Sequence, residues 1–373
     1  MKRKLISWLS LTLILSSIFG CLYGTTQIHP ALSTQELRGI WIRLPNNEPE
    51  IDRILDDISR AKFNAAFIET FYHGYTIYPS SVFPERPELD KQDLLNLFIK
   101  KAHQRHIQVH CWIEVFYWRP TPDTNFPQTP VLDKHPEWLD LDINGKTTEG
   151  FESKHYLVNP SVPGVRQKII ELVQELCTKY PIDGINLDYI RYAAGNTEFG
   201  YNPYAIDKFK KRYGYDPKSI NSKTEPDKWQ TWAMFREQQV TELVALIAKT
   251  VKQSKKPVKL SAAVFPDYYQ HRYTDSRLQD WATWCETRYL DFLTPMCYSP
   301  SIEGIKKEIS VSQSGSGQVP VYPGLAGLAG SNHPALPLQI QAAREIGCKG
   351  EVIFCYSWMT TMPNIFTEIG NLK

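Results

Sequence analysis

Residues able to do acid–base chemistry follow a short apolar segment near the middle of the chain. In residues 181–192 (PIDGINLDYIRY), Ile185 and Leu187 share one parity of an expected strand, and Asn186 and Asp188 share the other. A core strand normally turns apolar side chains inward, so inward polar groups that end in a carboxylate indicate a reaction site. We take Asp188 as the first candidate catalytic residue, with a salt bridge to Arg191 or Arg43 as its structural alternative. Asp183, five residues earlier, is expected at the opposite end of the strand.

Two further carboxyl groups are candidate partners of Asp188. Glu114 ends the third expected strand and Asp267 follows the fifth. A pair of carboxyl groups is what glycosidic bond cleavage requires, one as acid and the other as nucleophile or base. Each also has a structural interpretation, because Glu114 could form a buried ion pair and Asp267 could form the turn of Phe265-Pro266-Asp267. The sequence leaves the choice between them open.

Aromatic and polar side chains lie close to the same strand ends. Trp and Tyr rings can stack on the C–H faces of sugars, while acidic, amide and guanidinium groups can bind hydroxyl groups. His110 lies within an apolar strand and is also expected as a core histidine. The residues expected to bind substrate are Trp41, Arg43, Glu69, Tyr72, His110, Trp112, Asn186, Arg191, Tyr298, Tyr356 and Trp358.

Eight strand-and-helix units position these residues. Short β-branched or aromatic runs alternate with segments of helical period, which predicts a parallel (β/α)8 TIM barrel in a single domain. Long loops are expected after strand three (117–159) and after strand four, where 202–213 has a helical pattern. The strands are expected at 37–44, 65–70, 107–116, 181–192, 258–265, 291–298, 319–325 and 350–357. The main helices are expected at 48–62, 91–105, 163–179, 228–252, 278–287, 302–313, 336–346 and 364–372.

The N-terminus has the pattern of an export signal. Lys2, Arg3 and Lys4 precede an apolar run of about fifteen residues, shorter than the roughly twenty that span a bilayer. The run ends at Cys21 in a sequence typical of lipoproteins, so we predict a signal peptide over 1–20, lipidation of Cys21, a tether over 21–36 and the barrel over 37–373. Cleavage near Gly24 and an uncleaved anchor are the alternatives. These features predict an exported protein of the cell envelope whose partner is the membrane.

Composition and spacing argue against several other classes. The chain has 42 Lys and Arg against 40 Asp and Glu, and three of the basic residues lie in the leader, so no nucleic-acid partner is expected. The six cysteines after Cys21 are expected to be free thiols, since no Cys-x-x-Cys pair occurs. No His-x-His follows the first strand, so a metal site is not expected. No cofactor is implied.

Several segments resemble one family, the glycosyl hydrolase-like 10 proteins, which are bacterial exported proteins and lipoproteins. The matching pieces follow the family's order over about half of the mature chain: 37–41 (LRGIW), 102–112 (AHQRHIQVHCW), 135–139 (HPEWL), Asn159-Pro160 with Val165-Arg166, and 183–192 (DGINLDYIRY). The resemblance implies a TIM barrel, action on a polysaccharide, and Asp188 as the catalytic carboxylate. The chain departs from the family's pattern at Glu114, where a small polar residue is expected, and at Glu69, where Gln is expected.

We interpret the sequence as a glycoside hydrolase that acts on a cell-wall or extracellular polysaccharide through carboxylate catalysis. Two alternatives stay open. One is a non-catalytic carbohydrate-binding or envelope-assembly lipoprotein built on the same barrel. The other is a metal-dependent polysaccharide deacetylase or amidase. Fold alone does not separate these alternatives.

Overall fold

The structure is a computed structural model that describes residues 36–43, 45–89, 91–120, 130–148, 155–193, 198–274, 276–328 and 333–372. Residues 36–373 form one compact unit. The predicted signal peptide, Cys21 and residues 21–35 of the predicted tether lie outside the described residues.

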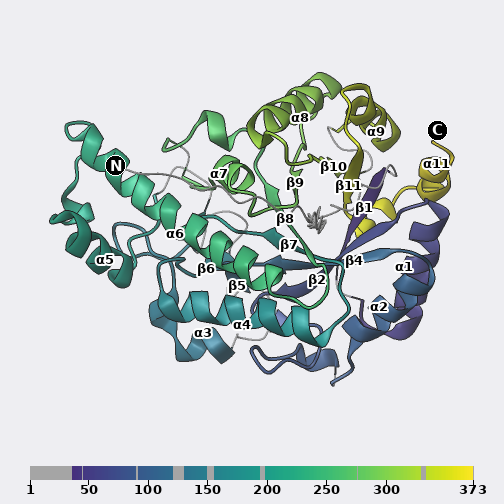
Figure 1. Ribbon diagram of the computed structural model, residues 1–373, viewed down its shortest axis with the longest axis horizontal. Coiled ribbons are helices and arrows are strands. Elements are labelled where there is room, and N and C mark those ends of the chain that lie inside the picture. The colour runs from purple at the N-terminus through teal and green to yellow at the C-terminus, as the bar shows by residue number, and fades with distance from the viewer. Residues whose placement is uncertain are drawn as a thin grey trace, which may run out of the picture. The chain divides into compact units, whose positions relative to one another are not determined.

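Parallel strands form a barrel in the part of the chain that the structure describes (Figure 1). Hydrogen-bonded neighbours follow the order β10-β11-β1-β2-β4-β7-β8-β9. Parallel bridges from Leu293 to Val321 and from Met296 to Gly324 join β9 to the segment of β10, so the sheet closes on itself. The predicted (β/α)8 barrel is confirmed. Its strands are β1 (Leu37–Ile42), β2 (Ala65–Tyr72), β4 (Gln108–Glu114), β7 (Gly184–Asp188), β8 (Lys259–Val264), β9 (Phe292–Pro295), β10 (Gly324–Ala326) and β11 (Gly350–Phe354).

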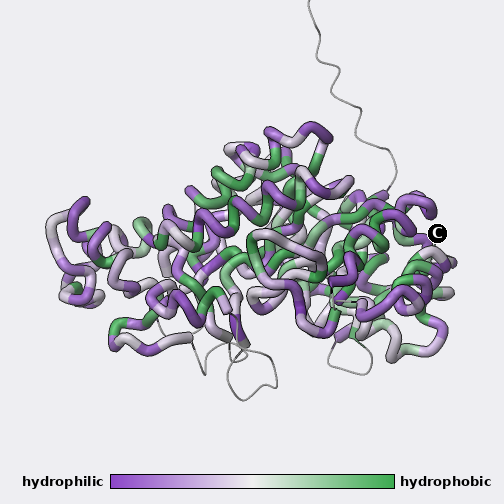
Figure 2. Tube along the Cα trace, turned by 90° about the horizontal axis from the view of Figure 1, so that it is seen from below, coloured by the Kyte–Doolittle hydropathy of each residue, from purple (hydrophilic) through white to green (hydrophobic). Residues whose placement is uncertain are grey.

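Helices surround the barrel and bury one apolar face each. In α1 (Glu48–Arg60) the Asn47 side chain caps the first turn, and the buried residues recur with helical spacing from Ile51 to Ile58. Figure 2 shows hydrophobic segments concentrated inside the fold and hydrophilic ones on its outer helices. The other surrounding helices are α2 (Leu94–Gln104), α4 (Pro163–Lys179), α6 (Pro226–Lys252), α7 (Trp281–Glu286), α8 (Ile302–Ser316), α9 (Leu336–Glu345) and α11 (Ile365–Asn371).

Most predicted strands are longer than those of the structure; the fourth, predicted at 181–192, is limited to Gly184–Asp188. Three further boundaries are also wrong. The seventh strand is limited to Gly324–Ala326, because Pro320 and Pro323 have no backbone N–H to donate to a neighbouring strand. The eighth strand ends at Phe354, and Tyr356 begins a short helix, α10 (Tyr356–Met359), instead of ending the strand. Helix α8 continues three residues beyond the predicted end at 313.

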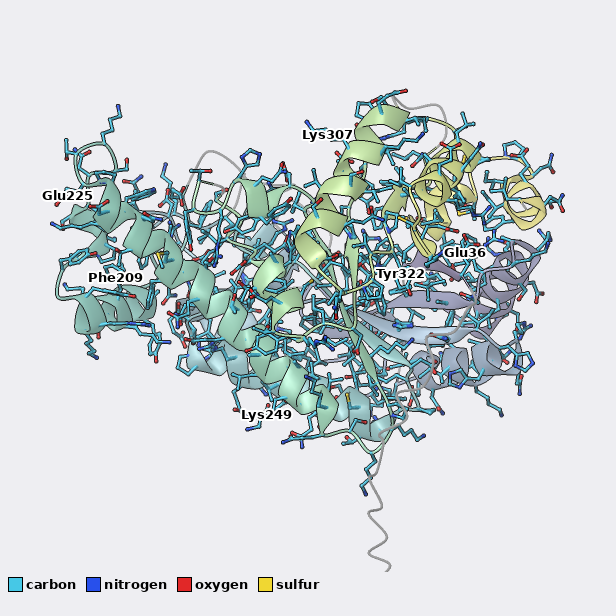
Figure 3. All side chains as sticks on the ribbon, turned by 45° about the horizontal axis from the view of Figure 1, so that its top comes forward. Glu36, Phe209, Glu225, Lys249, Lys307 and Tyr322 are labelled. Carbon is cyan, nitrogen blue, oxygen red and sulfur yellow. The ribbon has the colours of Figure 1, made fainter. Side chains whose placement is uncertain are left out.

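Two insertions leave the carboxyl ends of β4 and β7. The first contains an antiparallel pair of strands, β5 (Tyr117–Pro120) and β6 (His155–Leu157), with α3 (Pro130–Lys134) and the 3-10 turn η2 (Pro136–Trp138) between them in the chain. The second contains α5 (Pro203–Tyr213), which packs on the N-terminal half of α6 through Phe209, Trp232 and Phe235. We call α5 and this half of α6 the lobe; Figure 3 labels Phe209 and Glu225 there. The lobe has a hydrophobic cluster separate from that of the barrel.

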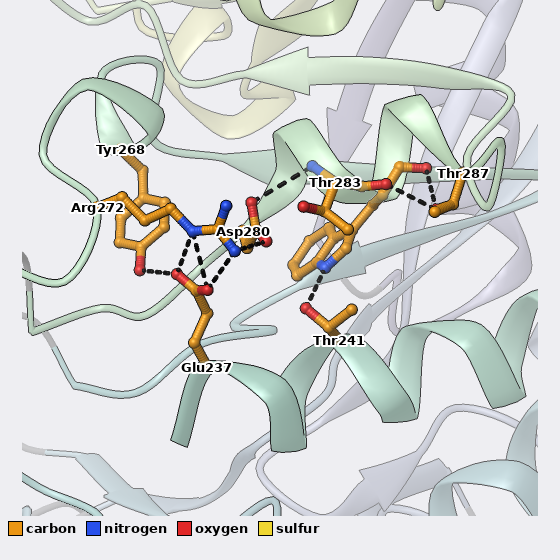
Figure 4. A network of polar contacts seen from close by, with 8 residues as sticks. Glu237, Thr241, Tyr268, Arg272, Asp280, Thr283 and Thr287 are labelled. Atoms are coloured by element: carbon orange, nitrogen blue, oxygen red, sulfur yellow. Dashed lines mark hydrogen bonds and ion pairs between the residues drawn. The ribbon is translucent and has the colours of Figure 1, made fainter. Parts of the chain in front are cut away.

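A polar network centred on the partly exposed Arg272 ties the loop after β8 to α6 (Figure 4). Arg272 donates to both carboxylate oxygens of Glu237 and, at 2.5 Å, to Asp280. The Tyr268 hydroxyl also donates to Glu237, at 2.7 Å. Because charge-assisted bonds of this kind are stronger than neutral ones, the network holds the loop that carries Asp267.

The amino end of the barrel contains Asp183, as predicted. Its carboxylate accepts the backbone N–H of Val109 at 2.7 Å and contacts His103 Nε2 at 2.8 Å. The six cysteines after Cys21 are all buried and free, which confirms the prediction of free thiols.

Candidate active site

A cavity of about 100 Å³ lies at the carboxyl ends of the strands. Its titratable lining side chains include Asp188, Glu114 and Arg43. Aromatic and apolar side chains, including Trp112, form much of its wall. We call it the barrel cavity; it is lined by Trp41, Arg43, Trp112, Glu114, Asp188, Tyr189, Arg191, Ala263, Met296, Tyr298 and Phe354.

Asp188 ends β7 with both carboxylate oxygens hydrogen-bonded. The indole N–H of Trp112 donates to Oδ2 at 3.0 Å, and the backbone N–H of Tyr189 donates to Oδ1 at 2.7 Å. Burial raises the pKa of Asp188, while the Tyr189 N–H, the Arg191 cation and the Trp112 N–H oppose that rise. Donors fixed on both oxygens favour the ionised carboxylate.

Glu114 lies beside Asp188 on the neighbouring strand. The two residues are register partners of β4 and β7, and side chains at paired positions of parallel strands project to the same face. Glu114 is 1% exposed, and its Oε2 atom has no hydrogen-bond partner among the described residues. Burial raises the pKa of Glu114 well above its ordinary value, nearby Glu69 adds to the rise, and Arg43 opposes it.

Arg43 stands between two carboxyl groups. Its guanidinium donates directly to Glu69 and lies 3.7 Å from Glu114 Oε1. The same group lies over the Trp112 ring, 4.8 Å from its centroid. Burial raises the pKa of Glu69 to about 7, and the Arg43 cation works against that rise. Arg43 therefore neutralises Glu69 first and leaves Glu114 less compensated.

The backbone bends sharply directly after Asp188. Tyr189 has a φ of 48°, in the left-handed region that residues with a side chain avoid. The Tyr189 N–H, at the start of this bend, donates to the Asp188 carboxylate. Arg191 then lies over the rings of Tyr189 and Phe265. Strain of this type costs on the order of 1–3 kcal/mol and is concentrated at functional sites.

Asp267 lies in a neighbouring hollow instead of the barrel cavity. This side hollow has a volume of about 710 Å³ and shares Met296 and Tyr298 with the barrel cavity. The Asp267 side chain is 48% exposed and pairs with Arg277 at 3.3 Å. The structure therefore brings Glu114, and not Asp267, beside Asp188.

The predicted substrate-binding residues fall into three groups: those that line the barrel cavity, those beside it and those away from it. Trp41, Arg43, Trp112, Arg191 and Tyr298 line the barrel cavity. Glu69 and Tyr72 lie behind it around Arg43, and Trp358 packs on Phe354 with ring centroids 4.9 Å apart.

The third group, which lies away from the cavity, consists of Asn186, His110 and Tyr356. Asn186 is buried below the cavity, where it accepts from Trp41 Nε1 and donates to Ser261 and Thr294. His110 is buried deeper in the barrel, stacked on Phe67, and burial lowers its pKa to about 4. Tyr356 donates to Asp57 of α1 at 2.8 Å, because α10 turns it outward.

Four lining residues were absent from the predicted set: Tyr189, Ala263, Met296 and Phe354. Ala263 and Phe354 share the inward parity of their strands, so strand parity could have found them. Tyr189 has the outward parity and reaches the cavity because of its left-handed backbone, which the sequence does not signal.

Two further observations concern only the described parts of the chain. No group of three or more His, Cys, Asp and Glu side chains there is arranged to hold a metal ion. None of the helices there combines the length and the apolar character needed to cross a membrane.

Comparisons with known proteins place the chain in a family. Residues 36–328 match the model of the glycosyl hydrolase-like 10 family. The chain is 22% identical to glycosyl hydrolase YngK of Bacillus subtilis, in a match that covers 72% of this chain and 55% of that protein. It is also 22% identical to glycosyl hydrolase DigH of Escherichia coli K12, in a match that covers 72% of this chain and 66% of that protein. The matches thus span only part of the length of both relatives.

The fold is similar to that of known glycoside hydrolases. The PgaB (BpsB) glycoside hydrolase domain of Bordetella bronchiseptica superposes with a TM-score of 0.66 at 13% identity, covering 91% of this chain and 98% of that one. Similarity at that identity shows the fold alone. Because the family model matches most of the sequence, the chain belongs to the glycosyl hydrolase-like 10 family.

Proposed function

We propose that the protein hydrolyses a glycosidic bond in a cell-wall or extracellular polysaccharide, with Glu114 and Asp188 as the catalytic pair. One observation carries the proposal: the two carboxyl groups are register partners that face one cavity with aromatic walls. Membership of a glycosyl hydrolase-like family agrees with it.

The environments of the two carboxyl groups assign their roles. Glu114 lacks a partner at Oε2 and its pKa is raised well above its ordinary value, which favours the protonated form and the role of general acid. Asp188 has a donor on each oxygen and acts as the carboxylate. Burial raises the pKa of both groups, but of the two only Asp188 has a hydrogen-bond donor on each oxygen. Surroundings that hold the two pKa values apart are the usual way to separate acid from base.

The spacing favours a retaining mechanism. Neighbouring strands lie about 4.8 Å apart, and retaining glycosidases hold their carboxyl groups about 5–5.5 Å apart. In the first step Asp188 bonds to the anomeric carbon while the bond to the leaving oxygen breaks and Glu114 protonates that oxygen. In the second step Glu114 takes a proton from water, whose oxygen displaces Asp188.

Aromatic side chains would hold the sugar ring. Trp112 and Tyr298 line the cavity with Asp188, and Arg191 supplies a cation at its edge. The side hollow, which shares Tyr298, offers room for the adjoining sugar.

A hydrolysis screen tests the proposal. Wild type and Asp188→Asn are incubated with peptidoglycan fragments and exopolysaccharides, and released reducing ends are measured. We expect release by wild type alone, with the anomeric configuration retained when the products are followed by NMR. Equal release by both proteins would exclude Asp188 as a catalytic residue.

The same screen separates the alternatives. Binding without release by wild type would favour a non-catalytic carbohydrate-binding protein. Release of acetate or of an amine that stops when a chelator is added would favour a metal-dependent deacetylase or amidase.

We also propose that the protein is exported and anchored by lipid at Cys21. The proposal rests on the basic and apolar leader that ends at this cysteine. Metabolic labelling with a fatty acid should mark the wild-type protein and fail to mark Cys21→Ala. Labelling that persists in the variant would rule out Cys21 as the attachment site.

A further inference from the structure

A third hollow lies on the insertions, outside the site described above. It has a volume of about 580 Å³ and lies where η2 meets the N-terminal ends of α4 and α5. Aromatic rings, prolines and carboxylates form most of its wall. We call it the lobe hollow; its principal lining residues are Trp138, Tyr204, Pro163, Pro203, Glu137 and Asp207.

Hydrogen bonds and packing fix part of the wall of the lobe hollow. Asn202 is buried and donates to the backbone oxygens of Glu137 and Leu139, both at 2.8 Å, while it accepts the N–H of Tyr204. Trp138 stacks in parallel on His135, and its ring edge packs on Gly164, where any larger side chain would collide with it. The Trp138 ring and the backbone at Tyr204 are therefore held in place before a ligand arrives, which lowers the entropic cost of binding.

The chemistry of the hollow fits a sugar. Tyr204 is 44% exposed, which leaves part of a large ring open to solvent. Glu137 and Asp207 supply acceptors for hydroxyl or ammonium groups, and the described residues that line the hollow include no Lys, Arg or His. His135 and Lys211 contact these carboxylates, at 3.0 and 3.1 Å. Carboxylate acceptors beside the partly exposed Tyr204 ring favour an uncharged or amine-bearing sugar over an anionic one.

The position of the hollow fits a polymer. The insertions that build it leave the carboxyl ends of β4 and β7, the strands that carry Glu114 and Asp188. In Figure 1, α3, α5 and the β5–β6 strand pair lie on the same side of the molecule, beyond one end of the barrel. We propose that the lobe hollow is a second glycan-binding site, which holds an uncharged or amine-bearing stretch of polysaccharide on the catalytic side of the barrel.

Affinity electrophoresis tests this site separately from hydrolysis. The full chain carrying Asp188→Asn is run through gels containing glycol chitin, hydroxyethyl cellulose, glycol chitosan or polygalacturonate. At least one of the first three should retard the protein, and Tyr204→Ala in the same background should bind about tenfold more weakly, the upper range for one aromatic contact. Tyr204→Phe keeps the ring and should bind like its parent.

A matched control removes a side chain of similar exposure outside the hollow. Met234 is 46% exposed on the N-terminal half of α6, and Met234→Ala should leave retardation unchanged. The proposal is overturned if none of the first three polymers retards the protein, if polygalacturonate binds best, or if Tyr204→Ala binds like its parent. A wild type that fails to hydrolyse any polymer would contradict the proposed activity and leave this binding result unaffected.

Discussion

Buried carboxyl groups occur at both ends of the barrel, but their surroundings differ. At the carboxyl end, Glu114 and Asp188 line a cavity with aromatic walls. At the amino end, Glu351 of β11 is 0% exposed, and its nearest ion-pair partner, Arg38 Nε, lies 3.9 Å away. Burial raises the pKa of Glu351 to about 8.

The difference shows that a raised pKa alone does not identify a reaction site. Arg38 is occupied by the backbone oxygen of Ile369, and Arg344 is paired with Glu36, so neither forms a hydrogen bond with Glu351. Burial perturbs both carboxyl groups, yet Glu114 also faces a cavity and a second carboxylate. An adjoining cavity and a neighbouring carboxylate therefore distinguish Glu114 at the carboxyl end from Glu351 at the amino end.

The largest expected effect comes from removing the proton of Glu114. We expect Glu114→Gln to lower kcat by about 10²–10⁴-fold on a natural glycan, because the leaving oxygen loses its acid. An aryl glycoside with an acidic phenol as leaving group needs little protonation and should lose far less. Steady-state kinetics on both substrates provides the measurement.

The matched control for Glu114→Gln is Glu351→Gln, which makes the same change at the amino end. Its kcat should equal that of wild type. Similar losses in both variants would mean that buried carboxyl groups at either end act only through stability.

A smaller effect is expected from replacing Arg43, the cation between Glu69 and Glu114. Removing it in Arg43→Met should raise the pKa of the Glu114 acid, because the positive charge now opposes that rise. The alkaline limb of kcat/KM should therefore move to higher pH, by about one unit. Arg43→Lys keeps the charge and should restore most of the wild-type profile. An alkaline limb that stays fixed or moves to lower pH in Arg43→Met would contradict this role.

The smallest effect is a change in stability at the amino end. The folded-state pKa of Glu351, about 8, lies above the ordinary Glu value, so its contribution to stability is present below the ordinary pKa and is lost as pH rises to about 8. The loss is at most about 1.4 kcal/mol for each pH unit. The Tm of Glu351→Gln minus the Tm of wild type should therefore increase by roughly 2–4 °C as the pH rises from 5 to 8.

Exposed Glu303 is the control position for this experiment. Glu303→Gln should follow the wild-type Tm at every pH. A wild-type Tm that does not fall relative to Glu351→Gln would show that Glu351 is not perturbed.

Strand patterns predicted the barrel because β-branched runs and helical periods are local properties of the chain. They also placed Asp183 and Asp188 at opposite ends of β7, since a strand rises by a fixed distance per residue. They could not choose between Glu114 and Asp267. That choice depends on the β4–β7 register and on the Arg277 pair, both of which are contacts between distant segments.

The weakest parts of the prediction were the direction of side chains that follow a strand and the depth of side chains within one. Tyr356 was expected at the site, but α10 begins directly after β11 and turns it toward α1. His110 has the inward parity expected of it, yet its depth in the barrel leaves it packed on Phe67. Parity gives the face on which a residue lies and not its height along the barrel axis.

Helix α6 has one consequence for how such proteins can diversify. Its 27 residues extend about 40 Å, so one half packs on the barrel while the other half supports the lobe, which has a hydrophobic cluster of its own. The lobe can therefore be lengthened, replaced or grafted from a relative while the barrel's packing is kept. That modularity makes the insertion a practical target for engineering new polymer preferences onto an unchanged reaction centre.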